Sequence, residues 1–230
     1  MNRFFVNYIV GARGDFLIKC LYDGASTFDT LKTLSTFCKV PAPIEYGVKT
    51  HGNFDTDIIT AIEDFPKKAK SWAELFDTVN RYQLVKIKIV AESFEERIDV
   101  LWFALSKTVL NDTALLPHLT IEEIPIPTRD ILYANNDYML HGVNVHIPRV
   151  QNMDKEFLHE YDYIVKFEDL FNAEYIRDLY KKINGKSMDY ARFRAIEKNI
   201  AMQYRLSKSE FYSILKLRHD AYIGTRQSRH

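Results

Sequence analysis

Short runs of apolar residues, many of them β-branched or aromatic, alternate along this chain with segments whose apolar residues recur at helical spacing. Three such runs predict strands, at residues 4–10, 84–91 and 163–167. Each is followed by a segment with the periodicity of an amphipathic helix, at residues 16–22, 94–108 and 173–183. This alternation predicts an α/β fold of three layers, in which helices cover both faces of a mostly parallel central sheet.

The stretches between these units carry weaker signals. We expect helices at residues 28–37 and 54–79, the second in two pieces divided near Pro66, and an extended piece at residues 45–49. Ser71 is the expected N-cap of the later helical piece, because its hydroxyl can accept a hydrogen bond from a free N–H of the first turn.

The C-terminal half contains a clear stop signal and a poorly patterned region. Asn184 and Gly185 predict the end of the helix before them, and residues 188–217 predict one long helix or two. Prolines punctuate short apolar pieces between about residues 111 and 150, which predicts a loop-rich insertion with short helices. A basic tail follows at about residues 220–230.

The composition fits one globular domain that spans residues 1–230. Hydrophobic residues make up 47% and charged residues 27%, and no stretch suggests a second core. Lys and Arg number 31 and so do Asp and Glu, which gives a formal net charge of +0. This balance excludes a chain-wide electrostatic footprint for a nucleic-acid duplex or an anionic membrane, so positive charge that binds phosphate must be local.

Two observations bear on the compartment. Cys20 and Cys38 are too few for a disulfide framework. The apolar run near the N-terminus is soon interrupted by glycine and charge, so it is too short for a signal sequence or a membrane span. We therefore expect a cytoplasmic protein without a membrane partner.

The sequence GlyAlaArgGlyAsp, residues 11–15, lies between the first predicted strand and its helix. A glycine turn there exposes backbone N–H groups, and the helix N-terminus adds about half a positive charge, so the junction suits a nucleotide 5′-phosphate. Arg13 is suited to a bidentate phosphate contact. No GlyLysSer or GlyLysThr follows, which disfavours ATP or GTP hydrolysis. The same junction also occurs as a purely structural turn, and the pattern alone leaves both interpretations open.

The tripeptide LysThrHis, residues 49–51, follows the short extended piece. A histidine at the C-terminal end of a strand lies where ligands of such sheets bind, and its near-neutral pKa suits proton abstraction from an acceptor hydroxyl. His51 is therefore a candidate base, although a loop histidine is commonly only a surface residue. The other histidines lack metal-ligand spacing with cysteines or acids, so we expect no metal site.

The order of these pieces resembles the sulfotransferases that use 3′-phosphoadenosine 5′-phosphosulfate. That family runs from a strand into a phosphosulfate-binding loop and helix, then to a LysThrHis segment, then to a strand and helix that bind the 3′-phosphate, and later to GluAspLeu after a strand. The corresponding pieces here are GARGDFLIKCL (11–21), KTHG (49–52), VKIKIVAESFEERIDVLWFALSK (85–107) and YIVKFEDL (163–170). The resemblance covers about residues 4–190 and rests on shared order.

The resemblance implies a P-loop-NTPase-like fold and transfer of a sulfonate from 3′-phosphoadenosine 5′-phosphosulfate to a hydroxyl or amine of a small-molecule or glycan acceptor, without a metal. His51 would deprotonate the acceptor, and Lys49 would neutralise developing negative charge. Arg97 and Ser106 would contact the 3′-phosphate. The 5′-phosphosulfate would be held by Gly11, Ala12, Arg13, Gly14, Asp15 and Phe16.

The chain departs from the family pattern in three places, one of which is the late ArgLysGly segment, for which it has no clear equivalent. Asp15 stands where the family has a phosphate-binding hydroxyl, and Glu92 and Ser93 stand where it has an arginine, so that Arg97 is displaced. These differences leave two alternatives open. One is a sulfotransferase-fold protein without the activity, which binds a nucleotide or a partner. The other is a small-molecule or nucleotide kinase, which would need a magnesium carboxylate and a phosphate-binding lysine.

Overall fold

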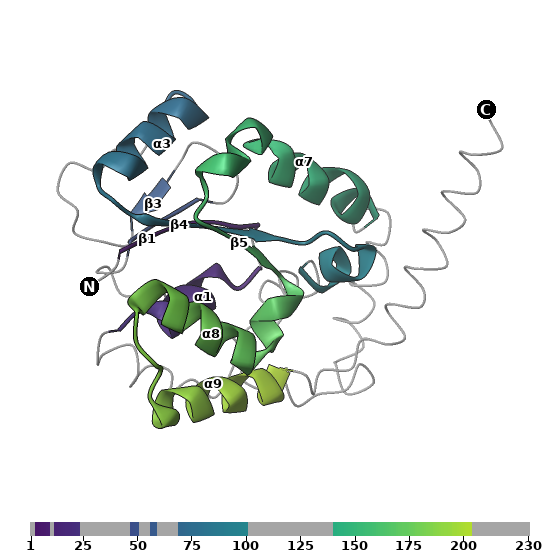
Figure 1. Cartoon of the computed structure of the whole chain (residues 1–230). Coiled ribbons are helices and arrows are strands. Elements are labelled where there is room, and N and C mark those ends of the chain that lie inside the picture. The colour runs from purple at the N-terminus through teal and green to yellow at the C-terminus, as the bar shows by residue number, and fades with distance from the viewer. Residues whose placement is uncertain are drawn as a thin grey trace.

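The computed structural model describes residues 3–9, 12–23, 69–100 and 140–201, and the backbone alone of residues 47–50, 56–58 and 202–203. Within these residues a five-stranded sheet forms the centre of the molecule, with helices packed above and below it (Figure 1). The fold is therefore α/β, as the alternation of strand and helix patterns predicts.

The sheet is parallel except for one edge strand. Its order is β3-β2-β1-β4-β5, and only β3 runs antiparallel to its neighbour. The strands are β1 (Phe4–Asn7), β2 (Gly47–Thr50), β3 (Thr56–Ile58), β4 (Val85–Val90) and β5 (Tyr163–Lys166).

Three strands, β1, β4 and β5, confirm the strand predictions, and β2 overlaps the predicted extended piece. The prediction of helix from residue 54 is wrong at its start, where Thr56 to Ile58 form β3. This segment pairs with β2, with Ile58 opposite Val48, and such a pairing between separate segments is not visible in a local pattern.

Helices cover both faces of the sheet (Figure 1). One face carries α1 (Gly14–Leu21) and α8 (Ala173–Asn184), with α9 (Tyr190–Gln203) packed outside α8. The other face carries α3 (Trp72–Arg81) and α7 (Ile147–Asn152), which is flanked by a π-helix, η3 (Gly142–His146), and a 3-10 helix, η4 (Lys155–Glu160). The chain from residue 94 to residue 100 is also helical.

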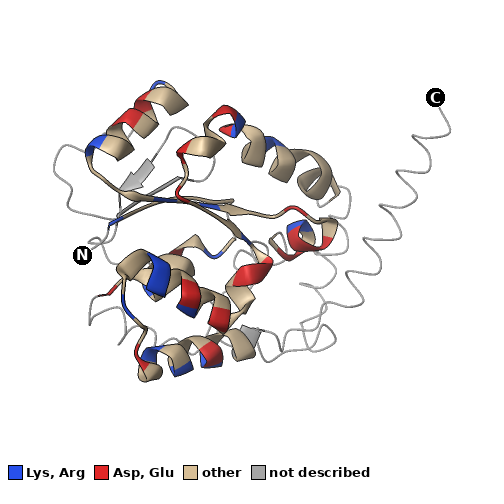
Figure 2. Cartoon of the chain, viewed as in Figure 1, with Lys and Arg blue, Asp and Glu red and all other residues tan. Residues whose placement is uncertain are grey.

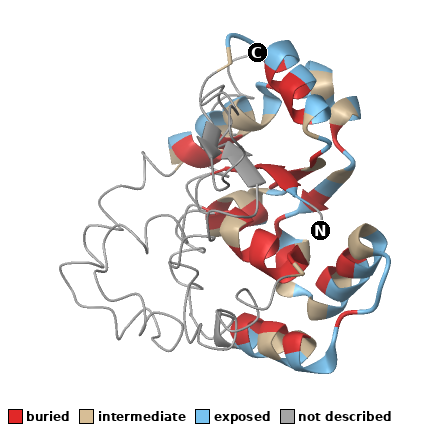
Figure 3. Cartoon of the chain, turned by 90° about the vertical axis from the view of Figure 1, so that its left-hand side faces the viewer, coloured by how far each residue is buried: buried red, intermediate tan, exposed pale blue. Residues whose placement is uncertain are grey.

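The two faces bury different apolar clusters because successive residues of a strand point to opposite sides. Phe4 and Val6 of β1 join Ile87 of β4 in the larger cluster, together with α1, α8 and α9. Phe5 joins Phe76 of α3 in the smaller cluster, where their rings meet edge to face at 5.9 Å. In Figure 3, where the ribbon is coloured by burial, buried positions lie along the sheet and on the sides of the helices that face it.

The structure confirms two helix boundaries that the sequence predicts, one at Ser71 and one at Gly185. Ser71 caps α3 by accepting a hydrogen bond from the Glu74 N–H at 3.2 Å, as predicted. Gly185 adopts φ 68° at the end of α8, a conformation that costs glycine little, which confirms the predicted stop. In the described part of the chain, no helix has the length and apolar character needed to cross a membrane.

Candidate functional site

The parallel strands end at one edge of the sheet, which we call the carboxyl edge. Asn7 of β1 is in register with Thr50 of β2 and with Lys88 of β4, and Val90 of β4 is in register with Lys166 of β5. The segments that follow these four strands therefore all leave the sheet at its carboxyl edge. In the strand order, β2 lies on one side of β1 and β4 on the other, so the order reverses between β1 and β4. Helices α1 and α3 accordingly lie on opposite faces of the sheet (Figure 1). Ligands of open α/β sheets bind at such a reversal.

The turn from β1 into α1 is tight. The Ala12 N–H donates to the Ile9 carbonyl at 2.8 Å, and Arg13 adopts φ 60°, a left-handed conformation that is uncommon outside glycine. Arg13 thus occupies the N-cap position of α1, and its carbonyl accepts from the Leu17 N–H at 3.1 Å. The backbone of the predicted anion-binding turn is therefore at the start of an eight-residue helix.

The side chain of Arg13 points into the protein. Its guanidinium donates to the Leu170 carbonyl at 3.3 Å and to the Asn199 Oδ1 at 3.0 Å. It also lies over the rings of Phe16 and Phe171, at 3.8 Å and 4.6 Å from their centroids. Arg13 is 5% exposed, so the side chain that the sequence assigns to a phosphate connects α1 to α9 and to residues 170 and 171, which precede α8.

Two further predicted residues of the turn, Gly14 and Asp15, lie against Tyr8. A Cβ added to Gly14 would overlap the ring of Tyr8, so glycine is required there by this contact. The Tyr8 hydroxyl lies 3.4 Å from the Asp15 Oδ1, which places the ring along the first turn of α1. Ala12, Gly14 and Phe16 are buried.

The second predicted motif reaches the carboxyl edge through β2. Lys49 lies in β2, where only the backbone is described, and Thr50 ends the strand beside Asn7 of β1. Thr50, the last described residue before His51, therefore lies beside the last residue of β1. His51 itself, with Gly11 and Ser106, lies outside the described residues.

Arg97, the predicted 3′-phosphate contact, lies in the helical turn that follows β4. A capping box opens this helix, because Ser93 Oγ accepts from the Glu96 N–H at 3.0 Å while one Glu96 oxygen accepts from the Glu92 and Ser93 N–H groups at 2.5 and 2.9 Å. Arg97 donates to the Glu92 carbonyl at 2.6 Å. Burial lowers the pKa of Arg97, although Glu95 and Glu96 act in the opposite direction.

The GluAspLeu motif forms η5 (Glu168–Phe171), which follows β5 at the carboxyl edge. Leu170 is fully buried, and its carbonyl is the acceptor for Arg13 described above. Phe171, at the end of η5, contacts Arg13 on one side and lines a groove of about 960 Å³ on the other. Helices α8 and α9, which carry both basic and acidic side chains (Figure 2), form the walls of that groove.

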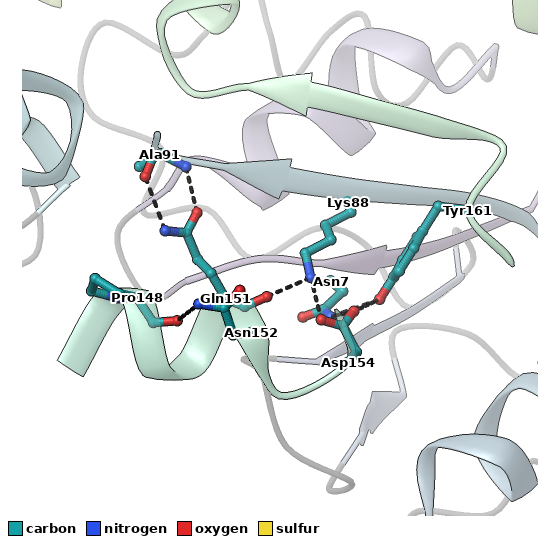
Figure 4. A network of polar contacts seen from close by, with 8 residues as sticks. All are labelled: Asn7, Lys88, Ala91, Pro148, Gln151, Asn152, Asp154 and Tyr161. Atoms are coloured by element: carbon teal, nitrogen blue, oxygen red, sulfur yellow. Dashed lines mark hydrogen bonds and ion pairs between the residues drawn. The ribbon is translucent and has the colours of Figure 1, made fainter. Parts of the chain in front are cut away.

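The structure adds a buried polar network that the sequence interpretation missed (Figure 4). Asp154, between α7 and η4, forms an ion pair with Lys88 of β4 and accepts hydrogen bonds from Tyr161 and Asn7, the latter at 2.9 Å. The Asn7 amide also donates to the Tyr161 hydroxyl at 2.7 Å. A signal was present, because Lys88 is flanked by apolar residues in a strand that helices cover on both faces, and a buried ammonium requires a partner.

Two members of the network, Lys88 and Tyr161, have shifted pKa values. Burial lowers the pKa of Lys88, while Asp154 opposes that change. Burial together with the negative charge of Asp154 raises the pKa of Tyr161 far above its ordinary value, so this phenol remains protonated and donates to the carboxylate. The described residues contain no cluster of three or more histidine, cysteine or acidic side chains arranged to hold a metal ion.

The chain was compared with protein families, curated proteins and solved structures. No family model, curated protein or solved structure matches it. A functional proposal for this chain therefore depends on its own residues and their arrangement at the carboxyl edge.

Proposed function

We propose that this chain is a sulfotransferase of P-loop-NTPase-like fold that transfers a sulfonate from 3′-phosphoadenosine 5′-phosphosulfate to a hydroxyl or amine. The observation that supports the proposal is the register of β1 with β2 and β4, which brings four separate motif segments to one edge of the sheet. Thr50 lies beside Asn7, the last residue of β1, and His51 is the residue that follows Thr50 in the sequence.

The chemistry requires a base and stabilisation of charge. The donor supplies the sulfonate and leaves as 3′,5′-adenosine diphosphate. His51 accepts the proton of the acceptor hydroxyl or amine, whose oxygen or nitrogen forms the new bond to sulfur as the bond between sulfur and the 5′-phosphate oxygen breaks. Lys49 and the N-terminus of α1 neutralise the negative charge that develops on the leaving phosphate.

This function places one demand on the β1–α1 turn. Arg13 is engaged inside the protein, so the first turn of α1 would hold the 5′-phosphosulfate through backbone N–H groups instead of this guanidinium. Tyr8 lies along the same turn, against Gly14 and beside Asp15, and must move for an anion to reach the backbone. Binding of the donor is therefore coupled to displacement of the Tyr8 ring.

The same contacts support a second candidate, an interaction protein of this architecture that binds a partner and has neither the nucleotide site nor the transferase activity. In that case Gly14 is required only for packing against Tyr8, and Arg13 only for joining α1 to α9. The two candidates differ in whether the turn accepts an anion at all.

Thermal unfolding with 3′,5′-adenosine diphosphate separates them. If the chain is a sulfotransferase, the product nucleotide at 100 times its Kd adds about 2.7 kcal/mol to the free energy of unfolding and raises Tm. Tyr8→Ala should bind the nucleotide more tightly than the unsubstituted chain, because the ring no longer covers the turn. Stabilisation by ATP with magnesium, and none by the adenosine bisphosphate, would favour a kinase instead.

A variant at the predicted base tests the reaction separately from binding. His51→Ala should abolish sulfonate transfer and leave the affinity for 3′,5′-adenosine diphosphate nearly unchanged, because the base acts on the acceptor. If neither the unsubstituted chain nor Tyr8→Ala binds the nucleotide, the transferase proposal fails and the second candidate stands.

A further inference from the structure

Residues 147–161, which run from the start of α7 to just before β5, contact the ends of β1 and β4. We call these residues the brace segment. Its first contact is with β4. The Gln151 side chain accepts from the Ala91 N–H at 2.6 Å and donates to the Ala91 carbonyl at 2.9 Å, as a neighbouring strand would (Figure 4). Ala91 directly precedes Glu92, where the chain turns into the capping box at the carboxyl edge. Gln151 therefore fixes the point at which β4 ends.

The second contact of the brace segment is with β1. Asp154 and Tyr161 together receive both N–H donors of the Asn7 side chain, and Asn7 is the last residue of β1 before Tyr8 and the turn into α1. Lys88 joins the same network by donating to the Gln151 carbonyl at 2.8 Å and by its ion pair with Asp154. The brace segment thus connects the last residue of β1 to the end of β4.

The groups that form this network indicate that it positions the strand ends more than it stabilises the fold. Asp154 is fully buried and Lys88 is 3% exposed, and a buried ion pair contributes little net stability because desolvation offsets most of the attraction. An apolar pair of similar size would replace the two charges themselves at comparable stability. Hydrogen bonds, unlike apolar contacts, fix the direction and distance between groups, so what this network adds is a defined geometry at the two strand ends.

We propose that the brace segment positions the ends of β1 and β4 for a ligand at the carboxyl edge, with Gln151 and Asp154 as its positioning residues. The functional part of this inference rests on the proposed nucleotide-binding function. The positioning itself is a property of the protein without ligand, and it can be measured separately.

Gln151→Ala tests the contact with β4, and Asn152→Ala is its matched control. Asn152 is the next residue of the same helix, and its exposed side chain donates to the Pro148 carbonyl at 2.8 Å within α7. We expect Gln151→Ala to speed amide hydrogen exchange at residues 92–96 about tenfold, as for loss of two hydrogen bonds, and to weaken binding of 3′,5′-adenosine diphosphate by a similar factor. Asn152→Ala should change neither.

The contact with β1 is tested by replacing the ion pair with apolar residues. Lys88→Met combined with Asp154→Leu should lower Tm less than Asp154→Ala does, because no charge is left buried, although Asn7 and Tyr161 lose their acceptor. The double variant should also speed exchange at residues 12–16 and weaken nucleotide binding about tenfold. Exchange and affinity that match the unsubstituted chain in both tests would overturn the inference. If no nucleotide binds to any variant, the proposed function fails, and the exchange rates alone decide whether the brace segment positions the strand ends.

Discussion

Two buried cations lie on opposite faces of the sheet and are held in different ways. Lys88 is held by the Asp154 carboxylate, a carbonyl and the neighbouring ring of Tyr161. Arg13 is held by a carbonyl, by the amide oxygen of Asn199 and by two aromatic rings. The comparison shows that a compact ammonium was buried with a counter-ion, whereas a planar, more weakly hydrated guanidinium was buried with oriented dipoles and π-faces.

The largest loss of stability is expected when the Asp154 carboxylate is removed. Asp154→Ala leaves the Lys88 ammonium buried without its counter-ion, so the free energy of unfolding should fall by about 3–5 kcal/mol in urea denaturation. Glu197→Ala is the control, because it breaks an ion pair with Arg194 at 2.6 Å in which both side chains are much more exposed, and should cost less than about 1 kcal/mol. Equal losses in the two variants would show that the burial of Lys88 does not depend on Asp154.

The next largest loss of stability is expected when the Arg13 guanidinium is removed. Arg13→Ala removes two hydrogen bonds and two ring contacts and leaves the Leu170 carbonyl buried, so unfolding should become easier by about 2–3 kcal/mol. Arg13→Lys should recover little of this loss, because an ammonium cannot reproduce the planar fork of donors. Full recovery with lysine, measured by the same urea titration, would show that charge alone holds this position.

A smaller effect is expected when the partner of Arg13 is changed. Asn199→Leu removes one acceptor and should cost about 1 kcal/mol. Asn199→Asp gives Arg13 a carboxylate partner like that of Lys88, and its stability should stay within about 1 kcal/mol of the unsubstituted chain, because the stronger bond offsets the desolvation of the acid. Thermal unfolding of the two variants tests this order, and an aspartate variant less stable than the leucine variant would contradict it.

The smallest effect is expected at a more exposed ion pair at the end of α1. Burial by itself raises the pKa of Asp23, but hydrogen bonds from Lys186 and Tyr180 outweigh it and leave the pKa below 3.8. The stability that this carboxylate contributes is therefore present above pH 3.8 and is lost as pH falls through its lower value in the folded protein. Stability measured from pH 5 to pH 2 should fall less steeply in Asp23→Asn, and identical slopes would refute this contribution.

The architecture follows largely from local patterns, whereas the placement of the buried charges does not. The β-rich runs at β1, β4 and β5, the Ser71 cap and the Gly185 stop are each encoded within a few residues, so the sequence predicts them. Asn7 and Asp154 are 147 positions apart. Their contact depends on how the brace segment packs on the sheet, which no local pattern specifies.

The position of the GlyAlaArgGlyAsp turn in the fold was predicted, whereas the contacts of its side chains were not. The GlyAlaArgGlyAsp turn does lie at a strand-to-helix junction, as its composition indicates. The direction of the Arg13 side chain was not predictable, because it depends on Asn199, which is 186 positions later in the chain. Lys88 was identifiable as a buried charge from its strand, but its counter-ion was not.

The contact between Tyr8 and Gly14 also constrains how this protein can diverge. Because a methyl group on residue 14 would overlap the ring of residue 8, a larger side chain at residue 14 is tolerated only if the aromatic residue is lost or moves. Homologues should therefore exchange these two positions together, keeping an aromatic opposite glycine or a small side chain opposite a larger one. Residues 8 and 14 together would then indicate which homologues keep an aromatic ring packed against the first turn of α1.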